Sequence, residues 1–153
     1  MDVSLDDADR RILRELQRDS SRPVTELAQA VGLSHAPCWR RLQRLRSEGI
    51  IQREAAVLDP VKCGFGVELL VFVRMSAHGR GRLNEFREEI SAHPEVVAAY
   101  ILLGNIDAML HVVVRDMREY ERFYMEHLAQ SQSVAEINSM TVLSHVKNGE
   151  LPI

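Results

Sequence analysis

The sequence has few cysteines, no long apolar run and no signal-peptide pattern. Its 153 residues contain two cysteines, Cys38 and Cys63, which are too few for a disulfide framework and typical of a reducing compartment. Since no run of eighteen apolar residues is present, we expect no membrane span. The acidic start, MDVSLDDADRR, lacks the apolar core of a signal peptide. We therefore expect a cytoplasmic protein without a membrane partner.

The chain also lacks the net positive charge that is typical of nucleic-acid-binding proteins, since its formal net charge is −3. The charge is unevenly distributed, however. Residues 31–53 carry five arginines against one glutamate, a local charge of +4, whereas residues 55–153 carry nine basic and thirteen acidic residues. A local basic patch attracts phosphate groups even when the whole chain is acidic. A solvated arginine-rich helix face gives the same count, so charge alone leaves both interpretations open.

The first fifty residues show the spacing of three short helices. We expect the helices to begin after Asp6, Pro23 and Ser34, because these residue types are favoured at helix N-termini. Gly32 and Gly49 are expected to end the second and third helices. Two short helices around a glycine turn, of which the second is rich in arginine, are typical of a helix-turn-helix. A three-helix unit that does not bind DNA shows the same apolar stripe.

The third predicted helix has an inward and an outward face. Cys38, Leu42 and Leu45 recur at helical spacing and are expected to point inward. The second helix of a helix-turn-helix enters the DNA major groove, where side chains read base edges and arginines hold phosphates. We expect Ser34 to cap the helix and to contact a phosphate, and Arg41 to contact phosphate or to brace the domain. Arg40, Gln43 and Arg44 are the best candidates to contact bases or phosphates. The full set of candidate DNA-binding residues is Ser34, His35, Ala36, Pro37, Trp39, Arg40, Arg41, Gln43 and Arg44.

The second half of the chain predicts an α+β fold of the ferredoxin-like type. Strand and helix patterns follow one another in the order βαββαβ, with a hairpin at Gly104-Asn105 between the second and third strands. We expect a winged-type helix-turn-helix domain over residues 1–52, a hinge over 53–65 and the ferredoxin-like domain over 66–153. Ile50 to Leu58 is expected to form a short strand or ribbon within this connection.

The predicted strands are apolar on both faces. Such a sheet rarely leaves one large apolar face exposed in a soluble monomer, so we expect a second subunit to cover it.

The spacing of His35 and Cys38 suggests metal or thiol chemistry as an alternative use of the third helix. Two ligands on one turn are not a site, however, since a structural zinc takes four. Cys38 also falls on the inward stripe, where a small apolar residue is expected. We expect no metal, no cofactor and no catalytic residue, and therefore not an enzyme.

Five stretches resemble the Lrp/AsnC (leucine-responsive regulatory protein) family of transcriptional regulators. They occur in family order and spacing and are LDDADRRILRELQRD, ELAQAVGLSHAPCWRRLQRLRSEGII, LDPVKCGF, GNIDAML and TVLSHVKNGELP. The resemblance implies a sequence-specific regulator of transcription that binds double-stranded DNA, forms dimers that assemble to octamers, and binds a small effector, usually an amino acid. The positions that match the family's effector pocket are Tyr100, Gly104, Asn105, Asp107, Met117, Ser139, Met140 and Thr141.

The chemistry of the Gly104 to Asp107 loop suits an amino acid. Asp107 can accept from the ammonium group, and backbone N–H groups of the glycine turn can donate to the carboxylate. The same residues are also expected where they only shape a hairpin. The sequence departs from the family pattern at Ile137 to Ser139, which replace Thr-x-Thr, and at Met140 and Ala108, which stand where aromatic or similar residues are usual.

Two other functions fit the same resemblance. Some siroheme decarboxylases share this architecture, but they are expected to lack a basic recognition helix. A ligand-sensing or architectural protein with weak DNA binding is the other alternative, and a DNA-binding titration separates it from a regulator.

Overall fold

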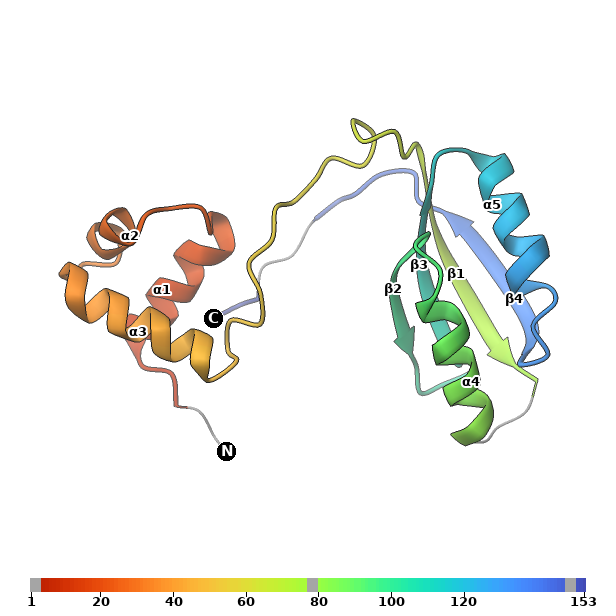
Figure 1. Cartoon of the computed structure of the whole chain (residues 1–153), viewed down its shortest axis with the longest axis horizontal. Helices are drawn as coiled ribbons and strands as arrows, with labels where there is room; N and C mark the ends of the chain where they lie inside the picture. Colours follow the sequence, from red (N-terminus) through yellow and green to blue (C-terminus); the bar gives the residue numbers. More distant parts are fainter. Residues whose placement is uncertain (1–3, 77–79, 148–150) are drawn as a thin grey trace. The chain divides into compact units, whose positions relative to one another are not determined.

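The computed structural model describes residues 4–76, 80–147 and 151–153. The chain divides into two compact units, which are described separately (Figure 1). The first comprises Met1–Val57 together with Lys147–Ile153, and the second comprises Leu58–Val146. This division assigns the residues from Lys147 to the first unit. The domain bounds expected from the sequence, 1–52, 53–65 and 66–153, stay a prediction. No helix in the described ranges is long and apolar enough to cross a membrane.

The first unit contains three helices: α1 (Asp7–Arg18), α2 (Val24–Ala30) and α3 (His35–Ser47). Helix α1 begins with a reciprocal capping box, in which Asp6 accepts from the Asp9 backbone and Asp9 accepts from the Asp6 backbone. Gly32 adopts a positive φ of 70° in the turn between α2 and α3, a conformation that favours glycine. The predicted helix-turn-helix is confirmed.

The three helices share one apolar core. Cys38, Leu42 and Leu45 of α3 are buried, as the helical spacing predicts. They pack with Ile12, Leu13, Leu27, Ala28 and Val31 of the other two helices. The expected ribbon of Ile50 to Leu58 is wrong, because residues 52–59 have no regular secondary structure. An extended segment becomes a strand only where another strand pairs with its backbone.

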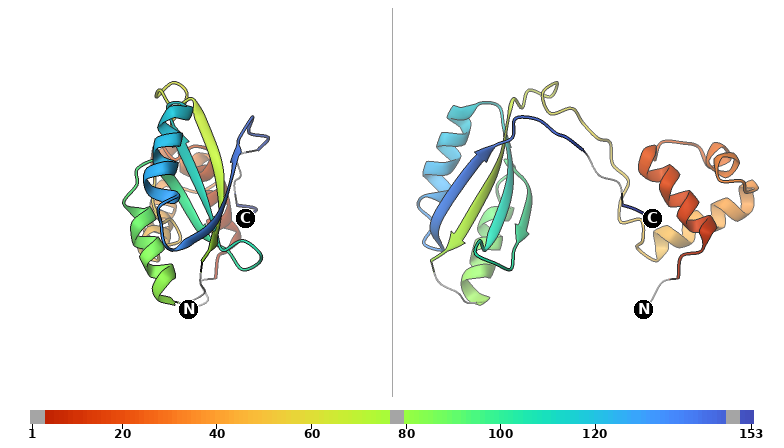
Figure 2. Two further views of the ribbon diagram at one scale, coloured as in Figure 1. Left: turned by 90° about the vertical axis from the view of Figure 1, so that its right-hand side faces the viewer. Right: turned by 180° about the vertical axis from the view of Figure 1, so that it is seen from behind.

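The second unit is a four-stranded antiparallel sheet with helices on one face (Figure 2). The sheet order is β2-β3-β1-β4, which confirms the ferredoxin-like βαββαβ fold. Its elements in chain order are β1 (Val67–Met75), α4 (Arg80–Ser91), β2 (Val96–Ile101), β3 (Ala108–Val114), α5 (Met117–Phe123), the π-helical continuation η1 (Tyr124–Leu128) and β4 (Val134–Thr141).

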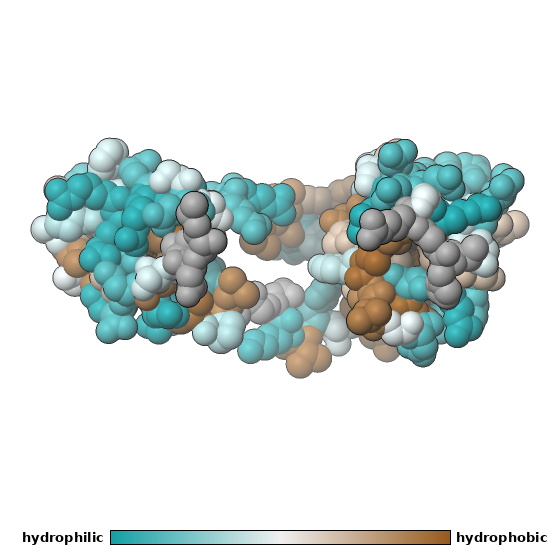
Figure 3. Space-filling model, turned by 90° about the horizontal axis from the view of Figure 1, so that it is seen from below, coloured by the Kyte–Doolittle hydropathy of each residue, from teal (hydrophilic) through white to brown (hydrophobic). Residues whose placement is uncertain are grey.

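The two faces of this sheet differ in burial. Leu69, Val71 and Val73 of β1 are almost completely buried, in one core with Phe86 and Phe123 of the helices. The alternate residues point to the other face, which no described element covers. This open sheet face carries Glu68, Leu70, Phe72 and Arg74 of β1, Met109, His111 and Val113 of β3, and Asn138 and Met140 of β4. Hydrophobic residues at the surface of this unit are visible in Figure 3.

Candidate nucleic-acid interface and effector site

Helix α3 presents most of the candidate DNA-binding residues to solvent. His35, Ala36 and Arg40 are exposed, and the side chain of Trp39 is 48% exposed although it is large and apolar. Pro37 and Gln43 are half-buried. Because the apolar stripe of α3 faces the core, these side chains project from the opposite side of the helix. They form one outward surface at its N-terminal end.

Ser34 occupies the N-cap position of α3 but makes no capping hydrogen bond through its side chain. Its hydroxyl is therefore not engaged in closing the helix, whereas its carbonyl accepts from the backbone of Cys38 at 3.2 Å. His35 and Cys38 do not form a shared site, because Cys38 lies in the core while His35 is exposed. Burial raises the pKa of the Cys38 thiol, which keeps it protonated and unreactive.

Two arginines of α3 are held by one buried carboxylate of α1. Asp9, whose side chain is 1% exposed, lies 2.9 Å from Nη1 of Arg41 and 2.5 Å from Nη2 of Arg44. A buried carboxylate needs charged partners to offset its desolvation, and here it has two. Arg41 therefore braces α3 against α1. Arg44, which the sequence suggested as a residue that contacts bases or phosphates, also forms an ion pair with Asp9. One edge of its guanidinium group is therefore held by α1.

Asp6 closes the same network from the exposed side. Its Oδ2 lies 2.6 Å from Nη1 of Arg41, and its Oδ1 accepts from the Asp9 backbone at 2.8 Å. The backbone hydrogen bond from Asp9 and the side-chain hydrogen bond from Arg41 lower the pKa of Asp6 to about 2. Asp6 is therefore negatively charged at neutral pH.

These side chains surround a small basic hollow. The hollow has a volume of about 340 Å³ and is lined by Asp6, Pro37, Arg40, Arg41 and Arg44. Three guanidinium groups face one exposed carboxylate, and Arg40 forms no ion pair with any acidic residue that the structure describes. Guanidinium groups bind phosphate oxygens through several parallel hydrogen bonds, so the chemistry of the hollow suits a phosphodiester.

In the second unit, Gly104, Asn105 and Asp107 lie in the hairpin between β2 and β3. The Asp107 carboxylate accepts from the Met75 backbone at 2.8 Å, and the Asn105 carbonyl accepts from Nε of Arg74 at 3.3 Å. The Asp107 side chain therefore ties the hairpin to the end of β1.

The other effector candidates are distributed over both outer strands. Tyr100 lies on β2 near the hairpin and is 53% exposed, whereas Met140 and Thr141 lie at the end of β4, across the sheet. Met117 begins α5, and Ser139 is hydrogen-bonded to the Tyr120 hydroxyl. Thr141 pairs with Leu69 and Ser139 with Val71, whereas the hairpin adjoins Val73, so these β4 residues are also offset from the hairpin by roughly 7 to 13 Å along β1. One chain does not enclose these residues in one pocket.

Models of two protein families match the chain along nearly its whole length. The AsnC-type helix-turn-helix domain matches residues 5–46, and the Lrp/AsnC ligand binding domain matches residues 68–152. The chain belongs to the Lrp/AsnC family. Members of this family are regulators of transcription. The exposed face of α3 lies within the residues that match the family's helix-turn-helix domain.

Individual Lrp/AsnC relatives agree in sequence and in structure. The glutamate uptake regulatory protein of Zymomonas mobilis is 36% identical over 143 residues, which cover 92% of this chain and 87% of that protein. An AsnC family transcriptional regulator from Agrobacterium tumefaciens superimposes with a TM-score of 0.90 at 41% identity, covering 97% of each chain. A transcriptional regulator from Neisseria meningitidis in complex with L-methionine gives a TM-score of 0.90 at 30% identity, covering 95% of this chain and 94% of that one.

A cluster that sequence reasoning missed lies on the open sheet face of this Lrp/AsnC domain. Glu68 of β1 is 2.5 Å from Nε2 of His111 on β3 and 2.7 Å from Nε2 of His145, which follows β4. Burial raises the pKa of Glu68, but the hydrogen bonds to His145 and His111 outweigh this and lower it overall. The ferredoxin-like strand order places β1 between the two histidines, which is the signal that predicts the cluster. No group of three or more histidine, cysteine or acidic residues in the described part of the chain is placed to hold a metal ion.

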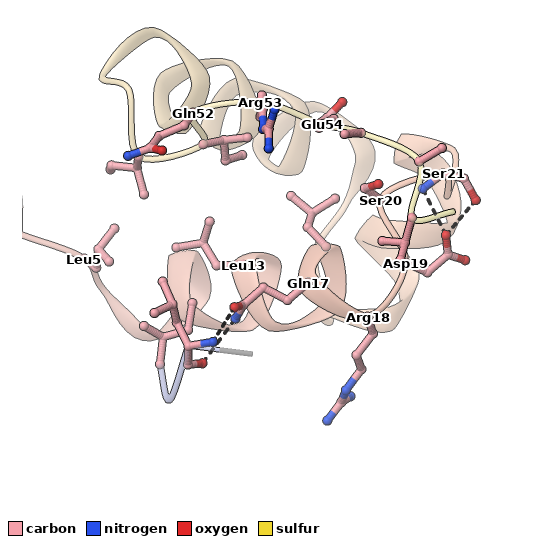
Figure 4. A pocket seen from close by; sticks show the side chains of 18 residues that line it. Leu5, Leu13, Gln17, Arg18, Asp19, Ser20, Ser21, Gln52, Arg53 and Glu54 are labelled. Atoms are coloured by element: carbon pink, nitrogen blue, oxygen red, sulfur yellow. Dashed lines mark hydrogen bonds between the residues drawn. The ribbon is translucent and has the colours of Figure 1, made fainter. Parts of the chain in front are cut away.

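The first unit of the Lrp/AsnC chain also holds its own C-terminal residues. Gln17 exchanges two hydrogen bonds with the Leu151 backbone, at 2.6 and 3.2 Å, and Arg14 donates to the Ile153 carbonyl. Leu151 and Ile153 help to line a hollow of about 770 Å³ between α1 and residues 50–57 (Figure 4). The terminal residues therefore add to the packing of the helix-turn-helix unit.

Proposed function

We propose that this regulator binds double-stranded DNA by placing the outward face of α3 in the major groove. The observation that carries the proposal is the arginine-rich exposed face, which Asp9 holds in a fixed orientation. Arg40 and Gln43 are proposed to reach base edges, together with Trp39 at the leading end of the helix. Arg41, Arg44 and the Ser34 hydroxyl are proposed to hold phosphates. His35, Ala36 and Pro37 complete the proposed contact surface at the N-terminal end.

We also propose that the protein acts as a homodimer that assembles further, to an octamer. Leu70, Phe72 and Met109 on the open sheet face support this proposal, because apolar residues gathered on one face favour burial against a second copy. A dimer also supplies two recognition helices for two half-sites of an operator.

The proposed effector is an amino acid bound by the second unit. The L-methionine complex of the Neisseria relative supports this class of ligand. Asp107 and the backbone of the Gly104 hairpin are proposed to hold the ammonium and carboxylate groups. Because Tyr100 and Met140 lie on opposite outer strands, a complete pocket requires a neighbouring subunit. We propose a regulator that acts in the cytoplasm and is not an enzyme.

An electrophoretic mobility shift on the gene's own upstream DNA tests the proposed function. The wild-type protein is titrated onto this duplex at low salt, without ligand and with each of the twenty amino acids. We expect a retarded complex without ligand, and a change in its apparent affinity or stoichiometry with at least one amino acid, because effector and DNA sites are coupled. Absence of any complex at low salt, with or without amino acids, would contradict DNA binding.

A further inference from the structure

Asp6 sits where a DNA phosphate is expected to bind. Its Oδ2 accepts from Nη1 of Arg41 at 2.6 Å, and its side chain is 53% exposed at the edge of the basic hollow. Arg41 thus lies between two carboxylates, the buried one of Asp9 and the exposed one of Asp6. The buried partner fixes the position of the guanidinium, whereas the exposed partner covers one of its outward N–H groups.

The exposed carboxylate and a phosphodiester need the same donors. A phosphate oxygen that enters the hollow approaches Arg40, Arg41 and Arg44 from the solvent side. There it competes with Asp6 for Nη1 of Arg41 and is repelled by the negative charge of Asp6. At a separation of roughly 5 Å in water, repulsion between two unit charges weakens binding several-fold.

We propose that Asp6 competes with a DNA backbone phosphate for the guanidinium group of Arg41. In the free protein Asp6 occupies Arg41, and this contact lowers the affinity of the helix-turn-helix for DNA. This inference rests on the proposed DNA binding. It adds that the affinity is limited by an intramolecular contact of α1. Because a phosphate contact carries no base information, the contact lowers affinity for specific and unrelated sequences by the same factor.

One substitution removes the ion pair between Asp6 and Arg41 while keeping the hydrogen bond by which residue 6 caps α1. Asn is as good an N-cap residue as Asp, so Asp6→Asn keeps the side-chain acceptor for the Asp9 backbone and removes only the charge. Asp7 is the matched control. It is exposed in the first turn of the same helix, and Asp7→Asn removes the same charge from a residue that is not a partner of Arg41.

The test is fluorescence anisotropy of two labelled duplexes, the upstream sequence and an unrelated one, at several salt concentrations. We expect D6N to tighten binding to both duplexes by about three- to tenfold. The slope of log affinity against log salt should steepen by up to about 0.9 for each bound recognition helix, because one more phosphate contact forms. D7N should tighten binding less than twofold. Equal effects of D6N and D7N, or a D6N gain confined to the upstream duplex, would overturn the inference.

A second pair of variants tests whether Arg41 transmits the effect. In the R41M background, whose side chain has no N–H donor, D6N should lose the part of its gain that comes from competition for Nη1 and keep only the smaller part that comes from charge repulsion at Arg40 and Arg44. A full gain from D6N without Arg41 would contradict the proposal. Thermal melting of each variant checks the fold, and D6S, which also keeps an N-cap acceptor, should repeat the D6N result. If wild-type protein binds neither duplex at low salt, the proposed function fails as well, whereas binding with equal D6N and D7N affinities removes only this inference.

Discussion

The two units of the chain position their candidate binding residues in opposite ways. In the helix-turn-helix unit, Asp9 of α1 fixes Arg41 and Arg44 of α3 within a single chain. In the sheet unit, the effector candidates lie on both outer strands, and a sheet face that carries Leu70, Phe72 and Met109 is left open. The comparison supports our proposals that one chain forms a preorganised DNA-binding surface and that effector binding depends on assembly. A ligand that alters assembly can then alter the placement of the recognition helices.

The largest expected effect is on assembly, through the open sheet face. Phe72→Glu places a charge between two subunits, and an unpaired buried charge costs several kcal/mol of association free energy. We expect the wild-type protein to sediment as a dimer or larger species at micromolar concentration and F72E to sediment as a monomer. Gln130→Glu, which adds the same charge at an exposed position, should not change the mass. A monomeric wild-type protein would contradict the proposed interface.

Effector binding should be sensitive to the charge of Asp107. Asp107→Asn keeps an acceptor for the Met75 N–H but removes the proposed partner of an amino-acid ammonium group. A ligand at a hundred times its dissociation constant stabilises a protein by about 2.7 kcal/mol, and D107N should lose most of this stabilisation. Thermal-shift screening with the twenty amino acids measures it. An undiminished ligand-induced shift in D107N would show that Asp107 only shapes the hairpin.

The brace between α1 and α3 should contribute to the stability of the first unit. Asp9→Asn removes the shared carboxylate of Arg41 and Arg44, although both arginines stay partly solvated. We expect the free energy of unfolding to fall by about 1–3 kcal/mol, as is usual when a charged hydrogen-bond network loses one member. Urea denaturation measures this, with the exposed Asp7→Asn as the control. Equal midpoints for D9N and D7N would be inconsistent with a structural brace.

The smallest expected effect is the pH dependence of the Asp6 contacts. The pKa of Asp6 is lowered from 3.8 to about 2, so its stabilising contribution is present above pH 4 and is lost as the pH falls towards 2. The urea midpoint of wild type should therefore exceed that of D6N at pH 5, and the difference should shrink towards pH 2. A difference that is constant over this range would refute the assignment.

Sequence reasoning succeeded where local rules decide the structure. The cap at Asp6, the start of α3 after Ser34, the inward stripe of Cys38 and the hairpin at Gly104 all depend on residues within one or two turns of each other, although the Ser34 side chain does not make the expected capping hydrogen bond. These features follow from helix capping, helical period and turn preference. The strand order of the second unit also followed, because the βαββαβ order restricts the possible topologies.

The features that sequence reasoning missed depend on contacts between distant residues. The contacts of Asp9 with Arg41 and Arg44 were not predicted, because these arginines lie 32 and 35 positions away along the chain. Leu151 meets Gln17 across 134 positions, which no local pattern predicts. The ribbon expected over residues 50–58 fails for a related reason, since its backbone has no strand partner among the described residues.

The central claim is that the exposed face of α3 reads DNA, and one comparison tests it most directly. Fluorescence anisotropy of the labelled upstream duplex is measured with wild type, with Arg40→Ala, and with Arg118→Ala as an exposed arginine of the other unit. We predict that R40A weakens specific binding by about 1–3 kcal/mol and that R118A leaves it unchanged. Equal affinity and equal salt dependence for R40A and wild type would contradict the claim.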